Sequence, residues 1–159
     1  SNVSQSVSHN VNVTVPSLTQ ARLAEEKLSE LEQTKAQGAD GATQQDKALV
    51  AYIQKAGGDA NFALMHLRRE MEMELRRILD KEVSYKTTTS NPERARFLSL
   101  RTLWNLFSER YPQERNSEPA FFYVVDVCNA STHGQTVPPE VAEEALSMGI
   151  RILDRFRGL

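Results

Sequence analysis

ALMHLRREMEMELRRIL, residues 63–79, decides the fold class of this chain. Its apolar residues recur at a spacing of three or four positions, at Leu64, Leu67, Met71, Leu75, Ile78 and Leu79. This spacing places them on one face of a helix and predicts that the face is buried. Asp59 is a favourable N-cap, so we expect a helix from about 60 to 82.

The opposite face of this helix carries arginines interleaved with glutamates, which allows two interpretations. The arginines of this face, Arg77 included, could form a strip that binds RNA phosphates. The candidate binding residues are Arg68, Arg69 and Arg76, with Arg151 in the last helix as a fourth. The glutamates favour a solvated face of ion pairs, because charges of mixed sign produce little net field. We prefer the ion-pair interpretation and keep the four arginines as candidate binding residues.

The rest of the C-terminal part also has helical signals. A helix over 92–110 begins at an Asn-Pro start signal and is apolar over most of its girth, which predicts a central position or a partner chain. Residues 112–118 are polar and predict a loop. Pro119 opens a third helix, and the last helix spans about 139–157. Together these segments predict an all-α, up-and-down helical bundle over 59–159.

Residues 1–58 differ in composition, because the single Trp and all six Phe lie after them. Aromatic side chains dominate core burial, so we expect the core in 59–159 and an N-terminal arm in 1–58. The arm has two predicted helices, at 18–36 and 44–55. Alternating valines in 5–15 leave two alternatives open, a short half-buried β-strand or a disordered leader.

Length, composition and charge exclude several classes of protein. The chain has 159 residues, 40% of them hydrophobic and 25% charged, which is typical of a globular domain and unlike a disordered chain. A net charge of −2 argues against a strongly basic nucleic-acid binder, although it permits a local basic patch. No apolar run approaches the roughly 20 residues that span a bilayer, so we expect no direct membrane insertion by this segment.

The single cysteine, Cys128, cannot form an intrachain disulfide, and no secretory signal peptide is visible. Both observations favour a cytoplasmic location. The chain begins at Ser1 without Met, so it could be a fragment of a longer protein with a membrane segment or another domain upstream.

Residues with catalytic potential are few. The sequence has no CxxC, HExxH or P-loop motif, and its histidines, His9, His66 and His133, lack ligand-type neighbours at metal spacing. We therefore expect neither a metal nor a cofactor. The remaining candidate is the polar run NASTHG, residues 129–134, at the end of the third helix.

This run, followed by VPPEVAEEA at 137–145 and a final amphipathic helix, resembles the HEPN superfamily (higher eukaryotes and prokaryotes nucleotide-binding). The stretch 63–72 is similar to the first helix of a bacterial branch of uncharacterised HEPN-like domains. The resemblance covers about 59–159 and implies an up-and-down bundle that pairs as a dimer. Many members are metal-independent RNA-cleaving toxins or defence nucleases, whose site is an Arg followed four to six residues later by a His.

In this sequence His133 matches the family's His, and Asn129 matches the polar residue often found between the two. The Arg would fall at 126–128, which reads Asp-Val-Cys, and an Asp repels phosphate where a cation is required. An arginine from another helix, such as Arg101 or Arg151, could substitute only through packing. His133 is therefore either a catalytic or RNA-contacting residue, or a capping residue whose ring bonds a helix-end carbonyl. The missing Arg favours capping.

We therefore expect a non-enzymatic HEPN-like dimerisation and binding module of a bacterial protein, associated with RNA or a nucleotide and with defence. It would form a homodimer or a higher homo-oligomer through the apolar second and third helices of the bundle. Two alternatives stay open. One is a metal-independent ribonuclease that uses His133 across a dimer interface, and the other is a cytosolic assembly domain of a larger membrane-anchored protein.

Overall fold

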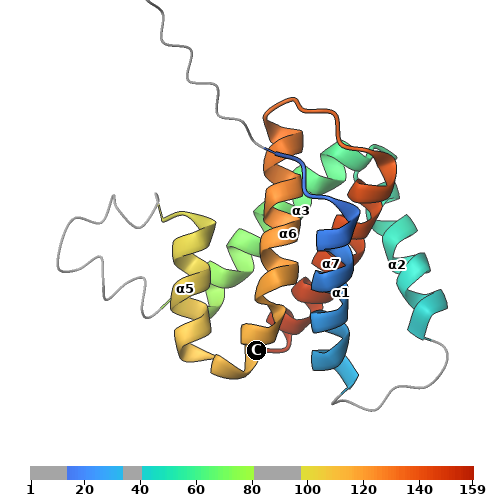
Figure 1. The fold of residues 1–159 in the computed structure, drawn as a ribbon. Helices are drawn as coiled ribbons and strands as arrows, with labels where there is room; N and C mark the ends of the chain where they lie inside the picture. The colour runs from blue at the N-terminus through green and yellow to red at the C-terminus, as the bar shows by residue number, and fades with distance from the viewer. Residues whose placement is uncertain (1–13, 34–40, 81–97) are drawn as a thin grey trace, which may run out of the picture.

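The computed structural model describes residues 14–33, 41–80 and 98–159 (Figure 1). Over these residues the chain forms α-helices, one short 3₁₀ helix (η2) and no strand: α1 (Leu18–Gln33), α2 (Gly41–Lys55), α3 (Ala60–Ile78), α5 (Leu100–Arg110), η2 (Pro112–Ser117), α6 (Glu118–Thr132) and α7 (Pro139–Arg157). The predicted all-α helical bundle is confirmed. The strand considered for 5–15 lies almost entirely outside the described residues.

The helix starts follow local signals in the sequence. Asp59 caps α3, and its Oδ1 accepts hydrogen bonds from two backbone N–H groups of the first turn at 2.7 and 3.3 Å. The helix ends at Ile78, four residues before the expected end at 82. Ser99 caps α5 in the same way, so the described part of the helix expected over 92–110 begins at Leu100.

The polar loop expected over 112–118 is instead η2 and the first residue of α6. Glu114 is buried there, and its carboxylate accepts two hydrogen bonds from the Arg155 guanidinium at 2.9 Å each. A carboxylate is stable inside a protein when it is paired in this way. The loop prediction was wrong because the partner lies on α7, 41 residues along the chain.

The described part of the N-terminal arm expected over 1–58, residues 14–33 and 41–58, packs against the bundle. α1 packs beside α6 (Figure 1), and Ala21, Ala24 and Leu28 belong to the same buried cluster as residues of α3, α6 and α7. Small alanine side chains let the two helices approach closely. α2 lies at the edge of the bundle, where Tyr52 is half-buried against the core. The described residues before and after position 58 therefore share one core.

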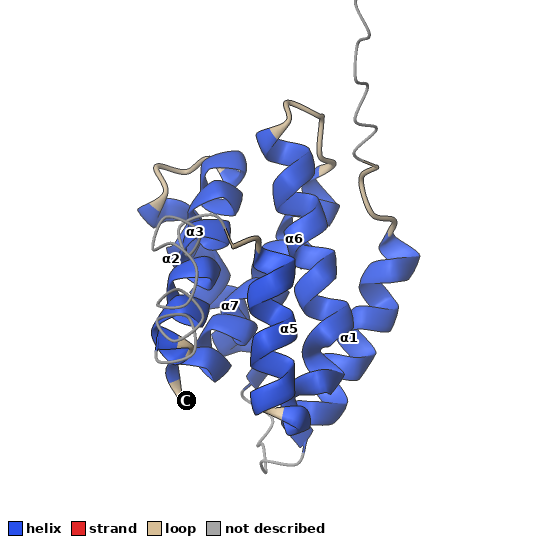
Figure 2. Ribbon diagram, turned by 90° about the vertical axis from the view of Figure 1, so that its left-hand side faces the viewer, coloured by secondary structure: helices blue, strands red, loops and turns tan. Residues whose placement is uncertain are grey.

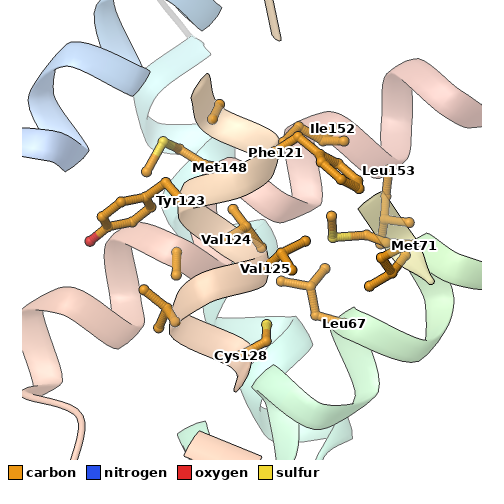
Figure 3. Packing of buried hydrophobic residues seen from close by; sticks show 14 of the residues in the cluster. Leu67, Met71, Phe121, Tyr123, Val124, Val125, Cys128, Met148, Ile152 and Leu153 are labelled. Atoms are coloured by element: carbon orange, nitrogen blue, oxygen red, sulfur yellow. The ribbon is translucent and has the colours of Figure 1, made fainter. Parts of the chain in front are cut away.

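The core is centred on α6, which lies between α1, α3 and α7 (Figures 1 and 2). Figure 3 shows apolar side chains of α3, α6 and α7 meeting there, among them Leu67, Met71, Phe121, Val124, Val125, Ile152 and Leu153. Trp104 of α5 stacks on Phe121, with ring centroids 4.5 Å apart. This packing fixes the axis of α6 and so the position of the polar residues at its C-terminal end.

The described helices divide their surface between core and solvent. α7, for example, buries Val141, Ile152 and Phe156 and exposes Glu143 and Asp154. None of the helices in the described ranges combines the length and the apolar character that crossing a bilayer requires.

Candidate functional site

The two halves of the candidate site come from α3 and α6. Arg68 lies two turns into α3 and Asn129 lies in the last turn of α6. The Nε of Arg68 donates a hydrogen bond to Oδ1 of Asn129 at 3.0 Å. Two residues that were singled out separately in the sequence, one as a binding candidate and one as a motif position, are therefore in direct contact.

His133 follows α6 directly and is its C-cap. Its backbone N–H donates to the carbonyl oxygen of Asn129 at 2.9 Å, and Gly134 ends the turn at a φ of 74°. The His133 side chain is exposed and has no hydrogen-bond or ion-pair partner within the described ranges. The backbone of His133 thus makes the cap, and its ring is directed to solvent rather than to a helix-end carbonyl.

Two hydroxyl groups complete the polar end of α6. Ser131 donates from Oγ to Oδ1 of Asn61 on α3 at 3.1 Å, and Thr132 donates to the carbonyl of Cys128 at 2.9 Å. We call the set Asn61, Arg68, Asn129, Ser131 and His133 the α3–α6 corner. It presents one guanidinium, two amides, one hydroxyl and one imidazole, which are groups that bind phosphate and sugar oxygens.

Arg151, by contrast, is buried between α7 and α1. Its guanidinium donates to Glu32 at 2.9 Å, to Ser29 at 3.3 Å and to Glu25. Although burial opposes the charged form, these hydrogen bonds and carboxylates raise the pKa of Arg151. Arg151 is committed to joining α1 to the bundle, so it cannot serve as a surface RNA contact.

The arginines of α3 form two groups that differ in their partners. Arg76 pairs with Glu72 at 3.0 Å and also donates to the carbonyl of Leu98, and Arg77 pairs with Glu74 at 2.7 Å. The ion-pair face preferred from the sequence thus exists in the C-terminal half of the helix.

Arg68 and Arg69 differ from them, because neither has a carboxylate partner among the residues that the structure describes. Glu70 is their nearest acidic neighbour in sequence. Its carboxylate instead contacts Nε2 of His66 at 2.6 Å and the guanidinium of Arg157 at 2.9 Å. The N-terminal half of α3 therefore keeps two cations available. Sequence spacing alone did not reveal this, because Arg157 lies 87 residues away from Glu70.

Asp126 occupies the region where the HEPN motif would have its Arg. Its side chain is largely exposed on α6. The surrounding protein partly desolvates the carboxyl group and so raises its pKa, and the positive charge of Arg101 offsets part of the rise. Arg101 lies over the Phe122 ring, 4.4 Å from its centroid. The arginine that packing brings to Asn129 is Arg68, and neither Arg101 nor Arg151 takes that place.

Cys128 contributes no nucleophile to the corner. Its side chain is fully buried, and burial raises the pKa of the thiol to about 12 while Arg68 partly opposes the shift. At neutral pH it stays a protonated thiol, which is a poor nucleophile. No group of three or more His, Cys, Asp or Glu side chains within the described ranges is placed to hold a metal ion.

A groove runs between α1 and α6, on the side of α6 away from α3. It encloses about 280 Å³ and is lined by Pro16, Gln20, Leu23, Ala24, Pro119, Phe122, Tyr123 and Asp126. Leu23 is 60% exposed. Apolar side chains that are this exposed to solvent indicate a surface suited to binding another apolar surface.

Comparison with protein-family models, with curated proteins and with solved structures found no match to this chain. The resemblance to the HEPN superfamily therefore stays a prediction from the sequence, made from residues 63–72 and 129–145.

Proposed function

We propose that this chain is a non-enzymatic, HEPN-like dimerisation and binding module of the bacterial cytoplasm that contacts RNA. The observation that supports dimerisation best is the groove between α1 and α6, which leaves Leu23 and Phe122 partly open to solvent. The observation that supports an anionic ligand is the Arg68 guanidinium, which an amide rather than a carboxylate holds in place.

The groove suits a second copy of the same chain. In a two-fold dimer each patch meets its own equivalent, so the patch must be complementary to itself. Arg101 and Asp126 provide one cation and one anion beside the Phe122 ring. A two-fold axis through the groove would place the apolar side chains of one copy against those of the other.

Binding rather than cleavage follows from the charges of the corner. RNA cleavage needs a base or acid at the ribose hydroxyl and a cation where phosphate charge develops. Arg68 supplies a cation, but its Nε is held by Asn129, and Asp126 places an anion where the HEPN motif has its Arg. These features suit retention of RNA better than turnover.

Sedimentation velocity at roughly 10–50 μM, a range suited to weak dimers, tests the dimer. We expect the wild-type chain to be dimeric and Leu23→Glu to be monomeric. Val50→Glu places the same charge on another exposed apolar residue, on α2, and should remain dimeric. A wild-type chain that sediments only as a monomer over this range would refute the dimer.

Fluorescence anisotropy with a labelled 12-nucleotide single-stranded RNA tests the RNA contact. We expect Arg68→Ala to weaken binding by about tenfold, and Arg22→Ala, which removes an exposed arginine of α1, to leave it within about twofold. Equal losses in the two variants would mean that only net charge matters.

A metal-independent ribonuclease remains the second candidate, and the contact between Arg68 and Asn129 favours it. Packing brings a cation to the motif that lacked one, one turn of helix before the exposed His133. Cleavage of mixed-sequence RNA in EDTA that is lost in both His133→Ala and Arg68→Ala would establish this activity. Absence of cleavage by the wild-type chain would remove it.

A further inference from the structure

The outer face of α3 carries exposed apolar side chains. Phe62 is 62% exposed, Met65 is 48% exposed and Met73 is 58% exposed. With Arg69 they occupy positions 62, 65, 69 and 73, a spacing of three and four that puts all of them on one side of the helix. This side faces away from Leu64, Leu67 and Met71, which fill the core.

A hollow of about 500 Å³ lies at the N-terminal end of this face. It is lined by Phe62, Met65, His66 and Arg69 of α3 and by Lys55 and Ala56 at the end of α2. Figure 1 shows the end of α2 and the beginning of α3 next to each other at the edge of the molecule. The hollow lies within the 300–1,000 Å³ range in which binding sites commonly fall.

The charge of the hollow is positive. Lys55 and Arg69 line it, and neither has a carboxylate partner in the part of the chain that the structure describes. Glu70 is next to Arg69 in sequence, but it already pairs with Arg157 and contacts the His66 ring. Over the described residues, the hollow therefore combines apolar lining side chains with two cations that have no carboxylate partner.

We propose that this α2–α3 surface, defined as Lys55, Phe62, Met65, Arg69 and Met73, docks an acidic amphipathic segment of a partner protein. Apolar side chains of the segment would enter the hollow and cover Phe62 and Met65. Carboxylates beside them would pair with Lys55 and Arg69. Carboxylates that meet these two cations provide the complementarity that selects an acidic partner over a neutral or basic one.

The extent of the face favours a peptide over a small ligand. Phe62 and Met73 are eleven residues apart, which corresponds to about 16 Å along a helix, so the apolar row continues well beyond the hollow. Methionine and phenylalanine are typical of surfaces that bind amphipathic peptides, because Met adapts its shape to different partners. A single small anion would leave Met73 uncovered.

This surface is distinct from the α1–α6 groove and from the α3–α6 corner, so its test is independent of the proposed function. The probe is a phage library of random 16-residue peptides, selected on the wild-type chain and counter-selected on Phe62→Ala/Arg69→Glu. Both substituted side chains are exposed, so the variant should fold normally. We expect the recovered peptides to have apolar residues three or four positions apart and an excess of Asp and Glu.

Synthetic copies of the recovered peptides then measure affinity. We expect Phe62→Ala to weaken binding at least about tenfold and Lys55→Glu/Arg69→Glu to reverse the preference toward lysine-substituted peptides. Leu18→Ala and Arg22→Glu make matched changes at exposed residues of α1 outside the groove and should have no effect. Recovery of peptides without acidic enrichment, or binding insensitive to Phe62→Ala, would overturn the proposal.

Other occupants give different outcomes in the same variants. If Phe62→Ala abolishes self-association in sedimentation velocity, a second copy occupies the surface. If adenosine monophosphate or a 12-nucleotide RNA binds there and no peptide is recovered, the occupant is a nucleotide. Either outcome refutes docking of a partner peptide.

Discussion

Arg68 of α3 donates from Nε to Oδ1 of Asn129 of α6, across 3.0 Å. The contact joins two helices through residues that are 61 positions apart in the chain. It also fixes the plane of the guanidinium at the polar end of α6, beside the turn that contains His133. This hydrogen bond thus has two roles. It links α3 to α6, and it holds the positive charge of Arg68 in place through an amide rather than a carboxylate.

The structural role can be measured by a double-mutant cycle of Arg68→Ala and Asn129→Ala. We expect a coupling free energy of about 1 kcal/mol, because the bond is charge-assisted but half-exposed. Urea unfolding followed by the fluorescence of Trp104, the single tryptophan, provides the measurement. Strictly additive effects would mean that the two side chains do not interact in solution.

Removal of Arg151 should loosen α1 from the bundle. In Arg151→Met the apolar stem is kept, but Glu25 and Glu32 lose their shared cation and repel each other. Because both carboxylates are partly exposed, we expect a loss of about 2 kcal/mol in the free energy of unfolding rather than the full cost of an unpaired buried charge.

Urea unfolding checks this loss, and the triple variant Arg151→Met/Glu25→Gln/Glu32→Gln is the control. It should recover much of the stability, since it removes the repulsion along with the cation. A triple variant no more stable than Arg151→Met would show that packing of the arginine stem, rather than charge, holds α1.

Local sequence patterns predicted the helices but could not predict their polar partners. Asp59 was recognised as a cap, and the face containing Leu64, Leu67 and Met71 as buried, because both signals lie within one or two helical turns. Glu114 was placed in a loop, because nothing near it in sequence indicates that Arg155 will cover it. A charged residue is predicted to lie in solvent unless its distant partner is known.

Sequence patterns likewise identified only some residues of the candidate site. Asn129 and His133 were found from the motif that they share, since they are four residues apart. Arg68 was considered only as part of a charged strip, because its contact with Asn129 depends on how α3 and α6 cross. Arg151 was a candidate ligand-binding residue for its charge alone, and the α1 carboxylates that bury it lie about 120 positions earlier in the chain.

Gly149, in the middle of α7, allows close approach to α3. A Cβ at this position would lie 3.0 Å from Cγ of Leu67 and closer still to its Cδ2. Alanine is the better helix former by about 1 kcal/mol, but overpacking a buried side chain costs about 1–3 kcal/mol. We therefore expect Gly149→Ala to lower the free energy of unfolding by about 1 kcal/mol.

The effect of Gly149→Ala on the free energy of unfolding should change sign when Leu67 is replaced by alanine. Leu67→Ala alone costs about 2–5 kcal/mol, but in that background Gly149→Ala should stabilise by about 1 kcal/mol, because the methyl group then enters free space. Thermal unfolding of the four proteins measures the change of sign. Additivity of the two substitutions would contradict the close approach of α3 and α7.

Cys128 should make the fold sensitive to alkaline pH. Burial raises the pKa of its thiol to about 12, whereas a thiol in the unfolded chain ionises near its ordinary value of 9.0. Between these values the unfolded state loses the proton and the folded state keeps it, so stability is complete below pH 9 and falls as the pH rises. One such group contributes at most about 1.4 kcal/mol per pH unit. Tyr123, whose pKa burial also raises to about 12, adds to the slope above pH 10.

Cys128→Ala isolates the thiol, because Tyr123 stays in place in both proteins. Urea unfolding at half-unit steps from pH 8 to 11 should give a shallower decline for Cys128→Ala than for the wild-type chain, whatever the offset that the smaller side chain introduces at pH 8. A thiol reagent such as dithionitrobenzoate should leave the native chain unlabelled at pH 8 and label it fully in guanidinium chloride, since the sulfur is fully buried among core side chains. Parallel pH profiles together with rapid labelling of the native chain would mean that α6 opens at Cys128, and the packing that positions Asn129 and His133 would then be transient.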